Sequence, residues 1–145
     1  MNNASCIFCR IVSGEIEAAK VFEDEHTVVF LDSDPLFPGH CLVCPRVHYE
    51  TLPDVPAELL TPLFSTVKLI CGSVERGVGA EGSFVAQNNI ISQSVPHVHV
   101  HVVPRRKGDG LKGFFWPRRP YRDREHMLEI QQALQSAITY VRSNG

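Results

Sequence analysis

The sequence has 145 residues, of which 43% are hydrophobic and 21% charged, and its net charge is −2. This length and composition predict one domain over residues 1–145 with one hydrophobic core. No apolar run approaches the ~18 residues that span a bilayer, and residues 1–6 lack the basic and apolar stretches of a secretory signal. We therefore expect a soluble protein of the cytoplasm with no membrane partner.

The first third of the chain has the pattern of short strands. Residues 19–22 and 27–32 are apolar segments separated by the polar turn 23–26, which is hairpin spacing. Pro and Gly residues at 35–39 indicate a loop, and residues 40–44 form a third expected strand that Pro45 ends.

Two helices and two further strands are expected after this. Apolar residues recur every three or four positions from Pro56 to about Gly72, which predicts an amphipathic helix. Strands are expected at 84–86 and 95–103, joined by a polar loop at 87–93. A helix over about 122–143 would bury one apolar face, formed by Met127, Ile130, Leu134, Ile138 and Val141. These elements predict an α+β domain with a mainly antiparallel β-sheet, a central helix and a C-terminal helix.

Three histidines alternate with valines between Pro96 and Pro104. Side chains alternate across a strand, so His97, His99 and His101 would share one face, with the valines facing the core. We expect the imidazoles to line a surface or cleft, where mutual repulsion favours their neutral forms. A neutral imidazole can act as a nucleophile, a base or a metal ligand, so a catalytic zinc held by the strand itself is a serious alternative.

Residues 93–103, Gln-Ser-Val-Pro-His-Val-His-Val-His-Val-Val, resemble the signature of the histidine triad family. Shorter landmarks of that family follow the same order along the chain, so the resemblance covers roughly residues 5 to 107. They are Cys6–Cys9, Val21–Asp24, Asp32, Pro38–His40 and Pro45–His48. The resemblance implies the family's fold, a small nucleotide as substrate, no organic cofactor, and a homodimer.

The resemblance also implies roles for the histidines. His99 would attack the α-phosphorus, and water would then release a nucleoside monophosphate from the phosphohistidine intermediate. His101 would hydrogen-bond the phosphate oxygens, and His40 would orient the nucleophile. Ser94 would donate a hydrogen bond near the leaving group.

Further residues are expected to bind the substrate. Asp32 lies eight residues before His40, where relatives carry an Asp or Asn that binds the ribose hydroxyls. Gln93 is expected to contact phosphate. Asn88 is the first choice for an amide that reaches the α-phosphate or sugar, with Gln87 as the competing choice.

The five cysteines are an odd number, which favours reduced thiols or metal ligands over a disulfide scaffold. Cys6 and Cys9 have the spacing of half a zinc site. Some bacterial-type family members complete such a site with residues that correspond to His48 and His97, so the resemblance implies a structural Cys₂His₂ zinc. The alternative is a pair of reduced, partly buried thiols. Cys41 and Cys44 would point to opposite faces of a strand, and with Cys71 they are expected in the core.

Residues 105–124 contain eight Lys or Arg residues against two Asp residues, a net charge of +6 that leaves −8 on the rest of the chain. Such a patch suits a small polyanion better than a long nucleic acid, although a solvated loop without a ligand has the same composition. Glycines and aromatic residues at 107–119 favour a substrate with extra phosphates and a second base.

The leading hypothesis is therefore a hydrolase of diadenosine polyphosphates, and a nucleoside phosphoramidase with the same mechanism is the near alternative. A metallohydrolase with zinc on the histidine strand and a non-catalytic nucleotide-binding regulator are the alternatives of a different class.

Overall fold

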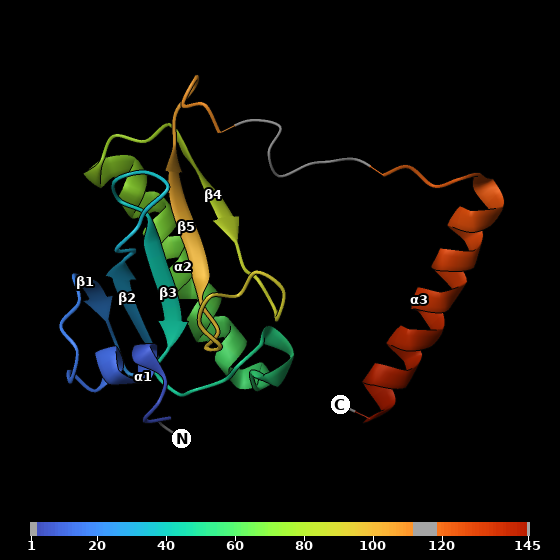
Figure 1. The fold of residues 1–145 in the computed structure, drawn as a ribbon, viewed down its shortest axis with the longest axis horizontal. Helices are drawn as coiled ribbons and strands as arrows, with labels where there is room; N and C mark the ends of the chain where they lie inside the picture. The colour runs from blue at the N-terminus through green and yellow to red at the C-terminus, as the bar shows by residue number, and fades with distance from the viewer. Residues whose placement is uncertain (1–2, 112–118, 145) are drawn as a thin grey trace. The chain divides into compact units, whose positions relative to one another are not determined.

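The structure is a computed structural model that describes residues 3–111 and 119–144 (Figure 1). It has two compact units, Met1–Asp109 and Gly110–Gly145.

The first unit is built on a five-stranded sheet in the order β1-β2-β3-β5-β4 (Figure 1). Every neighbouring pair is antiparallel. The strands are β1 (Lys20–Glu23), β2 (Thr27–Leu31), β3 (Cys41–Pro45), β4 (Gly82–Ala86) and β5 (Val100–Arg105). The predicted α+β fold with a mainly antiparallel sheet is confirmed.

Helices cover both faces of this sheet. Helix α2 (Ala57–Gly77) contacts β2, β3, β4 and β5, and α1 (Ile7–Val12) lies on the other face. A short 3₁₀ helix, η1 (Leu52–Asp54), precedes α2. The core consequently has two halves, because alternate residues of each strand face opposite helices. Val29 and Val43 pack with the α2 half, whereas Val28 and Leu42 pack with the α1 half.

The sequence analysis did not predict α1. The helix has six residues and buries Phe8, Cys9, Ile11 and Val12. A helix this short gives fewer than two turns of apolar periodicity, so its pattern is too brief to separate from that of a buried loop.

Helix α2 continues past its predicted end at Gly72 to Gly77. Glycine weakens a helix by about 1 kcal/mol relative to alanine, but Val74 in the following turn is buried in the core. Packing therefore outweighs the local preference. By length and composition alone α2 is the one helix in the described part of the chain that could span a membrane, and its buried residues lie against the sheet.

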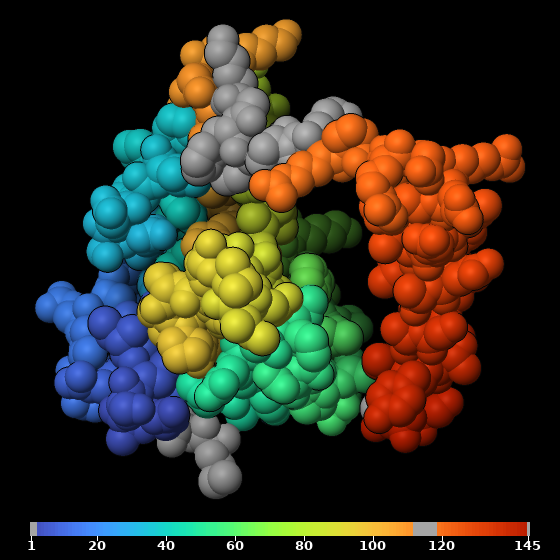
Figure 2. Space-filling view, turned by 45° about the vertical axis from the view of Figure 1, so that its right-hand side comes forward, coloured from blue at the N-terminus to red at the C-terminus, as the bar shows by residue number. Residues whose placement is uncertain are grey.

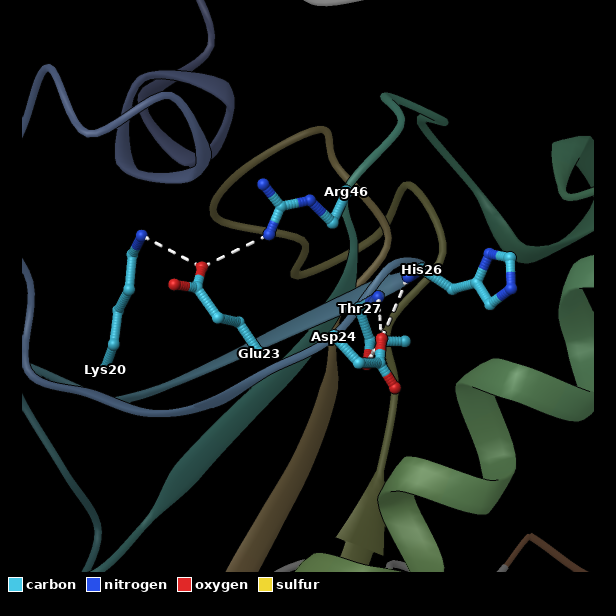
Figure 3. Close-up of polar contacts among 6 residues, drawn as sticks. All are labelled: Lys20, Glu23, Asp24, His26, Thr27 and Arg46. Carbon is cyan, nitrogen blue, oxygen red and sulfur yellow. Dashed lines mark hydrogen bonds and ion pairs between the residues drawn. The ribbon is translucent and has the colours of Figure 1, made fainter.

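The turn between β1 and β2 is held by side chains that also fix the end of β3 (Figure 3). Asp24 accepts hydrogen bonds from the backbone N–H groups of His26 and Thr27 and from the Thr27 hydroxyl. Arg46, just after β3, donates to Glu23 at 3.2 Å, and its backbone N–H donates to the His26 carbonyl. These contacts fix the backbone around Pro45, whose carbonyl binds a histidine described below.

The predicted strand at 95–103 is partly wrong, because β5 begins only at Val100. Pro96 has no N–H to donate, and the His97 N–H donates to the nearby Val95 carbonyl. The Val98 N–H donates to the Tyr49 carbonyl at 2.7 Å, outside the sheet ladder. Residues 95–97 therefore form a bend, and residues 98–99 lead into the strand while held against the segment that follows β3.

In the second unit, helix α3 (Arg124–Asn144) agrees with the predicted position of the C-terminal helix. The Asp123 carboxylate accepts the His126 N–H near its start. Within the described part of this unit nothing covers its apolar face, so the predicted burial of that face stays a prediction; its residues are Met127, Ile130, Leu134, Ile138 and Val141. Among residues 110–111 and 119–144, α3 is the one helix or strand, so no other element there can cover a face of it.

We predict a large stability difference between two leucines of α2. Leu63 is 1% exposed and Leu69 is 48% exposed. Leu63→Ala should lower the free energy of unfolding by about 2–5 kcal/mol because it leaves a cavity between helix and sheet. Leu69→Ala should change it by no more than about 0.5 kcal/mol. Urea unfolding followed by circular dichroism measures both, and equal losses would contradict the packing described here.

Candidate functional site

The three alternating histidines share one face, as predicted, but most of their surface is buried. His97 is fully buried and His99 is 3% exposed, while His101 is partly exposed. The edge of the Phe8 ring in α1 covers the His99 ring, with centroids 5.1 Å apart. The intervening valines lie in the α2 half of the core. Of the expected surface or cleft, His97 and His99 form a buried part that packs against Phe8 of α1, and His101 is the partly exposed member.

Burial keeps these imidazoles neutral. It lowers the pKa of His97 and His101 to about 4, and it lowers the pKa of His40 and His99 below the ordinary value of 6.5. Neighbouring imidazoles lower the pKa of His97 and His101 further, but by less than burial does. Neutral rings were predicted from the sequence because of repulsion between the imidazoles, which lowers these pKa values less than burial does.

The hydrogen bonds of His99 define which of its nitrogens carries the proton. Nδ1 lies 2.6 Å from the His97 carbonyl oxygen, which can only accept. The neutral ring must therefore carry its proton on Nδ1. This leaves the Nε2 lone pair of His99 without a proton and available to attack an electrophile.

A second chain of hydrogen bonds defines the protons of His40 and His101. The backbone N–H of Leu36 donates to Nδ1 of His40 at 3.2 Å, so the proton of His40 is on Nε2. That nitrogen donates to Nδ1 of His101 at 2.9 Å, so the proton of His101 is on its own Nε2. His101 can therefore donate to a ligand beside His99, whose ring centroid is 4.9 Å away.

Asp32 lies at the edge of this cluster. One carboxylate oxygen accepts the Asp34 N–H, and the other lies 3.7 Å from Nε2 of His40. Ser94 is exposed and its side chain has no hydrogen bond among the described residues. Both positions are compatible with the ligand contacts expected from the sequence.

The amide side chains after β4 hold their own loop together, at the molecular surface (Figure 2). Gln93 accepts the Ile90 N–H and donates to the Glu50 carbonyl at 2.6 Å. Asn88 donates to the Ser92 carbonyl. Gln87 donates to Asn89, a residue that the sequence analysis did not select and that also accepts the Leu52 N–H. The predicted contacts of Gln87, Asn88 and Gln93 with a substrate stay predictions.

The same loop contains backbone strain. Ile90 and Ser92 have φ angles of 68° and 60°, in the left-handed region that a β-branched side chain rarely adopts. Each such residue costs on the order of 1–3 kcal/mol, and the Gln93 side chain links Ile90 in this loop to the Glu50 carbonyl. The strain lies two residues before Ser94, directly upstream of the histidines.

A cavity of about 510 Å³ opens next to Asp32. Its walls are mainly apolar and come from α1, β2 and β3, with residues that include Ile7, Ile11, Phe30, Leu31 and Leu42. Its polar side chains are Asp32, Ser33 and Glu17. The sequence analysis did not find this cavity, because its walls come from three elements that only the fold brings together.

A candidate metal site includes His97, the first of the three alternating histidines. Cys6, Cys9, His48 and His97 each place a sulfur or nitrogen atom within 4.8 Å of the others. The His97 Nε2–H donates to the Pro45 carbonyl at 2.8 Å, which leaves Nδ1 unprotonated and facing both sulfurs at 3.5 and 3.6 Å. Two sulfurs and two imidazoles are a donor set that zinc prefers, and a histidine ligand with its other nitrogen on a carbonyl is the usual arrangement. The residues therefore fit zinc.

Asp32, His40 and His101 form the other group of close donors among the described residues. The hydrogen bond between His40 and His101 accounts for their proximity. Neither group contains two of the three alternating histidines, so the placement of donors does not favour the metallohydrolase alternative, in which the strand itself holds zinc.

The remaining cysteines are core residues. Cys41 and Cys44 are buried in opposite halves of the core, as predicted. Burial raises the pKa of the Cys44 thiol far above its ordinary value, which keeps it protonated and unreactive. Cys71 is partly buried against the α2 half.

Part of the predicted basic tail can be described. Arg105 forms a salt bridge with Asp109, and Arg106 donates to the Val78 carbonyl. These cations are therefore bound within the protein. Residues 112–118, which contain the aromatic cluster, lie outside the described residues.

Comparison with known proteins identifies the family. Residues 13–108 match the HIT domain. An uncharacterized HIT-like protein of Methanocaldococcus jannaschii is 43% identical over 107 residues, which cover 72% of this chain and 82% of that protein. The crystal structure of a Zn-bound histidine triad family protein from Mycobacterium smegmatis is 37% identical, with a TM-score of 0.71 and coverage of 97% and 98% of the two chains. The chain therefore belongs to the HIT, or histidine triad, family.

A relative with a named activity is also similar. The adenosine 5′-monophosphoramidase of Saccharomyces cerevisiae is 37% identical over 119 residues, which cover 79% of this chain and 72% of that protein.

The buried histidines predict a loss of stability in mild acid. His101 has a pKa of about 4 in the folded protein and about 6.5 when unfolded. The unfolded chain therefore binds more protons between these values, and stability should fall as the pH drops from about 6.5 to 4. His101→Asn removes one such group and keeps an acceptor for His40.

Urea midpoints at pH 7 and pH 5 test this prediction. The wild type should lose more stability between the two values than His101→Asn does. An identical loss in both proteins would show that His101 has no depressed pKa.

Proposed function

We propose that the protein hydrolyses small nucleotides at the α-phosphate through a covalent intermediate on His99. The observation that carries the proposal is the unprotonated Nε2 of a buried, neutral His99, fixed by the bond from Nδ1 to the His97 carbonyl. A neutral nucleophile needs no separate base, and its orientation is set before the substrate binds.

In the first step, Nε2 of His99 forms a bond to the α-phosphorus while the bond from phosphorus to the leaving group breaks. The leaving atom takes up a proton from water, and the exposed Ser94 hydroxyl would hydrogen-bond it. The ring of His99 becomes positively charged, and the His97 carbonyl stabilises this charge through Nδ1–H. His101 donates its Nε2–H to a phosphate oxygen, and His40 keeps that proton in place.

In the second step, water attacks the phosphorus and the bond to His99 breaks. A nucleoside monophosphate leaves, the water gives up a proton, and Nε2 of His99 regains its lone pair. One difficult displacement is thus divided into two easier ones.

The nucleoside would occupy the cavity beside Asp32. Apolar walls suit the faces of a base, and a carboxylate can accept hydrogen bonds from both ribose hydroxyls. We propose this role for Asp32. Gln87, Asn88 and Gln93 would act on the substrate by shaping the loop that presents Ser94, and direct contacts with phosphate would add to this.

A nucleoside phosphoramidate is the substrate class we favour. An apolar cavity of a size that suits a single nucleoside is lined by Asp32, which lies 3.7 Å from His40, and the named relative is a phosphoramidase. The diadenosine polyphosphate hypothesis depended on the basic aromatic tail, where Arg105 and Arg106 are already bound within the protein. It stays as the second candidate.

We further propose that Cys6, Cys9, His48 and His97 bind a structural zinc ion. The ion would tie α1 to the segment that carries His99 and would take no part in the chemical steps.

We also expect a homodimer. The five cysteines are free, which agrees with the proposed cytoplasmic location.

His99→Asn should abolish hydrolysis and preserve nucleotide binding, because it removes the attacking nitrogen and leaves the cavity intact. Product analysis with adenosine phosphoramidate, diadenosine triphosphate and diadenosine tetraphosphate measures the activity. Calorimetry with AMP measures binding. His26→Asn, an exposed histidine in the β1–β2 turn (Figure 3), is the matched control and should behave as the wild type.

Mass spectrometry of the wild type after rapid acid-free quenching should detect a nucleotidyl adduct on His99. Inertness toward all three substrates would refute the enzyme, and AMP binding without turnover would favour the regulator. Hydrolysis without any adduct would refute the covalent route.

Cys9→Ser should lose bound zinc and unfold at a lower temperature than the wild type, because it removes a ligand that links α1 to His97. Elemental analysis should find about one zinc per wild-type chain, as a single four-ligand site requires. Cys71→Ser, outside the donor group, should retain the metal. Equal zinc content in Cys9→Ser and the wild type would exclude this site.

A further inference from the structure

Two amide side chains hold the loop between β4 and β5 against the segment that follows β3. Oδ1 of Asn89 accepts the Leu52 N–H at 2.9 Å, and Nε2 of Gln93 donates to the Glu50 carbonyl at 2.6 Å. Both bonds end on main-chain groups that lie close together in the sequence. Both ends of the segment 89–93 are therefore attached to one stretch of main chain.

The bond at Asn89 pairs a donor that its own helix cannot pair. Leu52 is the first residue of η1, and the first N–H groups of a helix have no acceptor within it. The same oxygen of Asn89 also accepts from the Gln87 side chain at 3.2 Å. The amide nitrogen of Asn89 has no hydrogen bond to any residue within 3–111 and 119–144. The attachment therefore depends on the acceptor oxygen of Asn89.

Asn89 is also the first residue of a strained turn. The Ile91 N–H donates to the Asn89 carbonyl at 2.8 Å, and Ile90 between them has a φ angle of 68°. This is a γ-turn with positive φ, a rare conformation that persists only where surrounding contacts offset its cost. The bond to Leu52 fixes the residue that enters the turn. Without that bond the strain can relax, and the chain that leads to Ser94 can move.

Gln93 supplies the second attachment, but a substrate would compete for it. Its side chain accepts the Ile90 N–H and donates to the Glu50 carbonyl. The phosphate contact expected of Gln93 would draw on the same NH₂ group, which weakens or replaces the bond to Glu50. No substrate contact is expected of Asn89, so its bond to Leu52 can persist when a nucleotide binds.

We propose that Asn89 is a positioning residue that holds the loop presenting Ser94 while the nucleotide is bound. This inference rests on the proposed function for the role of Ser94, which would hydrogen-bond the leaving group. Asn89 acts through the main chain and needs no contact with the substrate. Its loss should therefore slow the departure of the leaving group without weakening the binding of the nucleotide.

Two substitutions test the proposal, with adenosine phosphoramidate as the substrate. Asn89→Ala removes the acceptor and should lower kcat roughly three- to tenfold, the effect of losing one hydrogen bond that acts on the transition state. KM and the Kd of AMP should stay within about twofold of the wild type. Asn89→Asp keeps an accepting oxygen and should retain the wild-type kcat. Ile91→Ala is the control, because this side chain is 79% exposed in the same loop, and it should behave as the wild type.

Backbone hydrogen exchange, measured by NMR with AMP bound, tests the attachment without turnover. The Leu52 N–H should exchange several-fold faster in Asn89→Ala than in the wild type, because it has lost its acceptor. Its exchange rate in Asn89→Asp and in Ile91→Ala should equal that of the wild type.

An unchanged kcat in Asn89→Ala, or an equal loss in Asn89→Asp, would overturn the proposal. A rise in the Kd of AMP that matches the loss of kcat/KM would also overturn it, because Asn89 would then act on binding. If the wild type hydrolyses no substrate while exchange at Leu52 follows the expected pattern, the attachment by Asn89 is supported and the proposed hydrolysis is refuted.

Discussion

The burial of a cluster of four imidazoles, two of which pack against Phe8 of α1, is the constraint on which the site depends. A charged ring is costly in that position, so His40, His97, His99 and His101 are kept neutral. Neutral rings have one proton each, and main-chain groups that can only accept or only donate decide where it lies. The result is one bare nitrogen on His99, one donor on His101 and one bare nitrogen on His97 that faces two sulfurs.

Helix α1 contributes to three parts of the site with very few residues. Cys9 within it and Cys6 just before it supply the sulfur donors, Ile7 and Ile11 line the cavity, and Phe8 covers His99. These functions alternate around the helix because one of its sides faces the Cys and His donors and another faces the cavity. A displacement of α1 would therefore alter the metal group, the cavity and the cover of His99 together.

The sequence was sufficient for the fold class, the antiparallel sheet and the shared face of the histidines, because strong alternation with valine leaves few other arrangements. The four donors of the candidate metal site were predicted only through the family resemblance. Cys6 and His97 are 91 residues apart, and spacing alone does not show that such distant residues meet. The sequence analysis missed α1 and the cavity, which depend on contacts between distant segments. It also extended the last strand back to residue 95, where Pro96 and the bond to Tyr49 take the backbone out of the ladder. The apolar face of α3 was recognised, but periodicity does not specify a partner.

The proton of His101 is positioned, through His40, by the amide of Leu36. A main-chain donor is present whatever side chain that residue carries, and Leu36 itself is 47% exposed. Evolution can therefore replace this leucine by almost any amino acid without disturbing the imidazoles. Proline is the exception, since an imino acid has no hydrogen to give, and a single such replacement would free both rings to exchange tautomers.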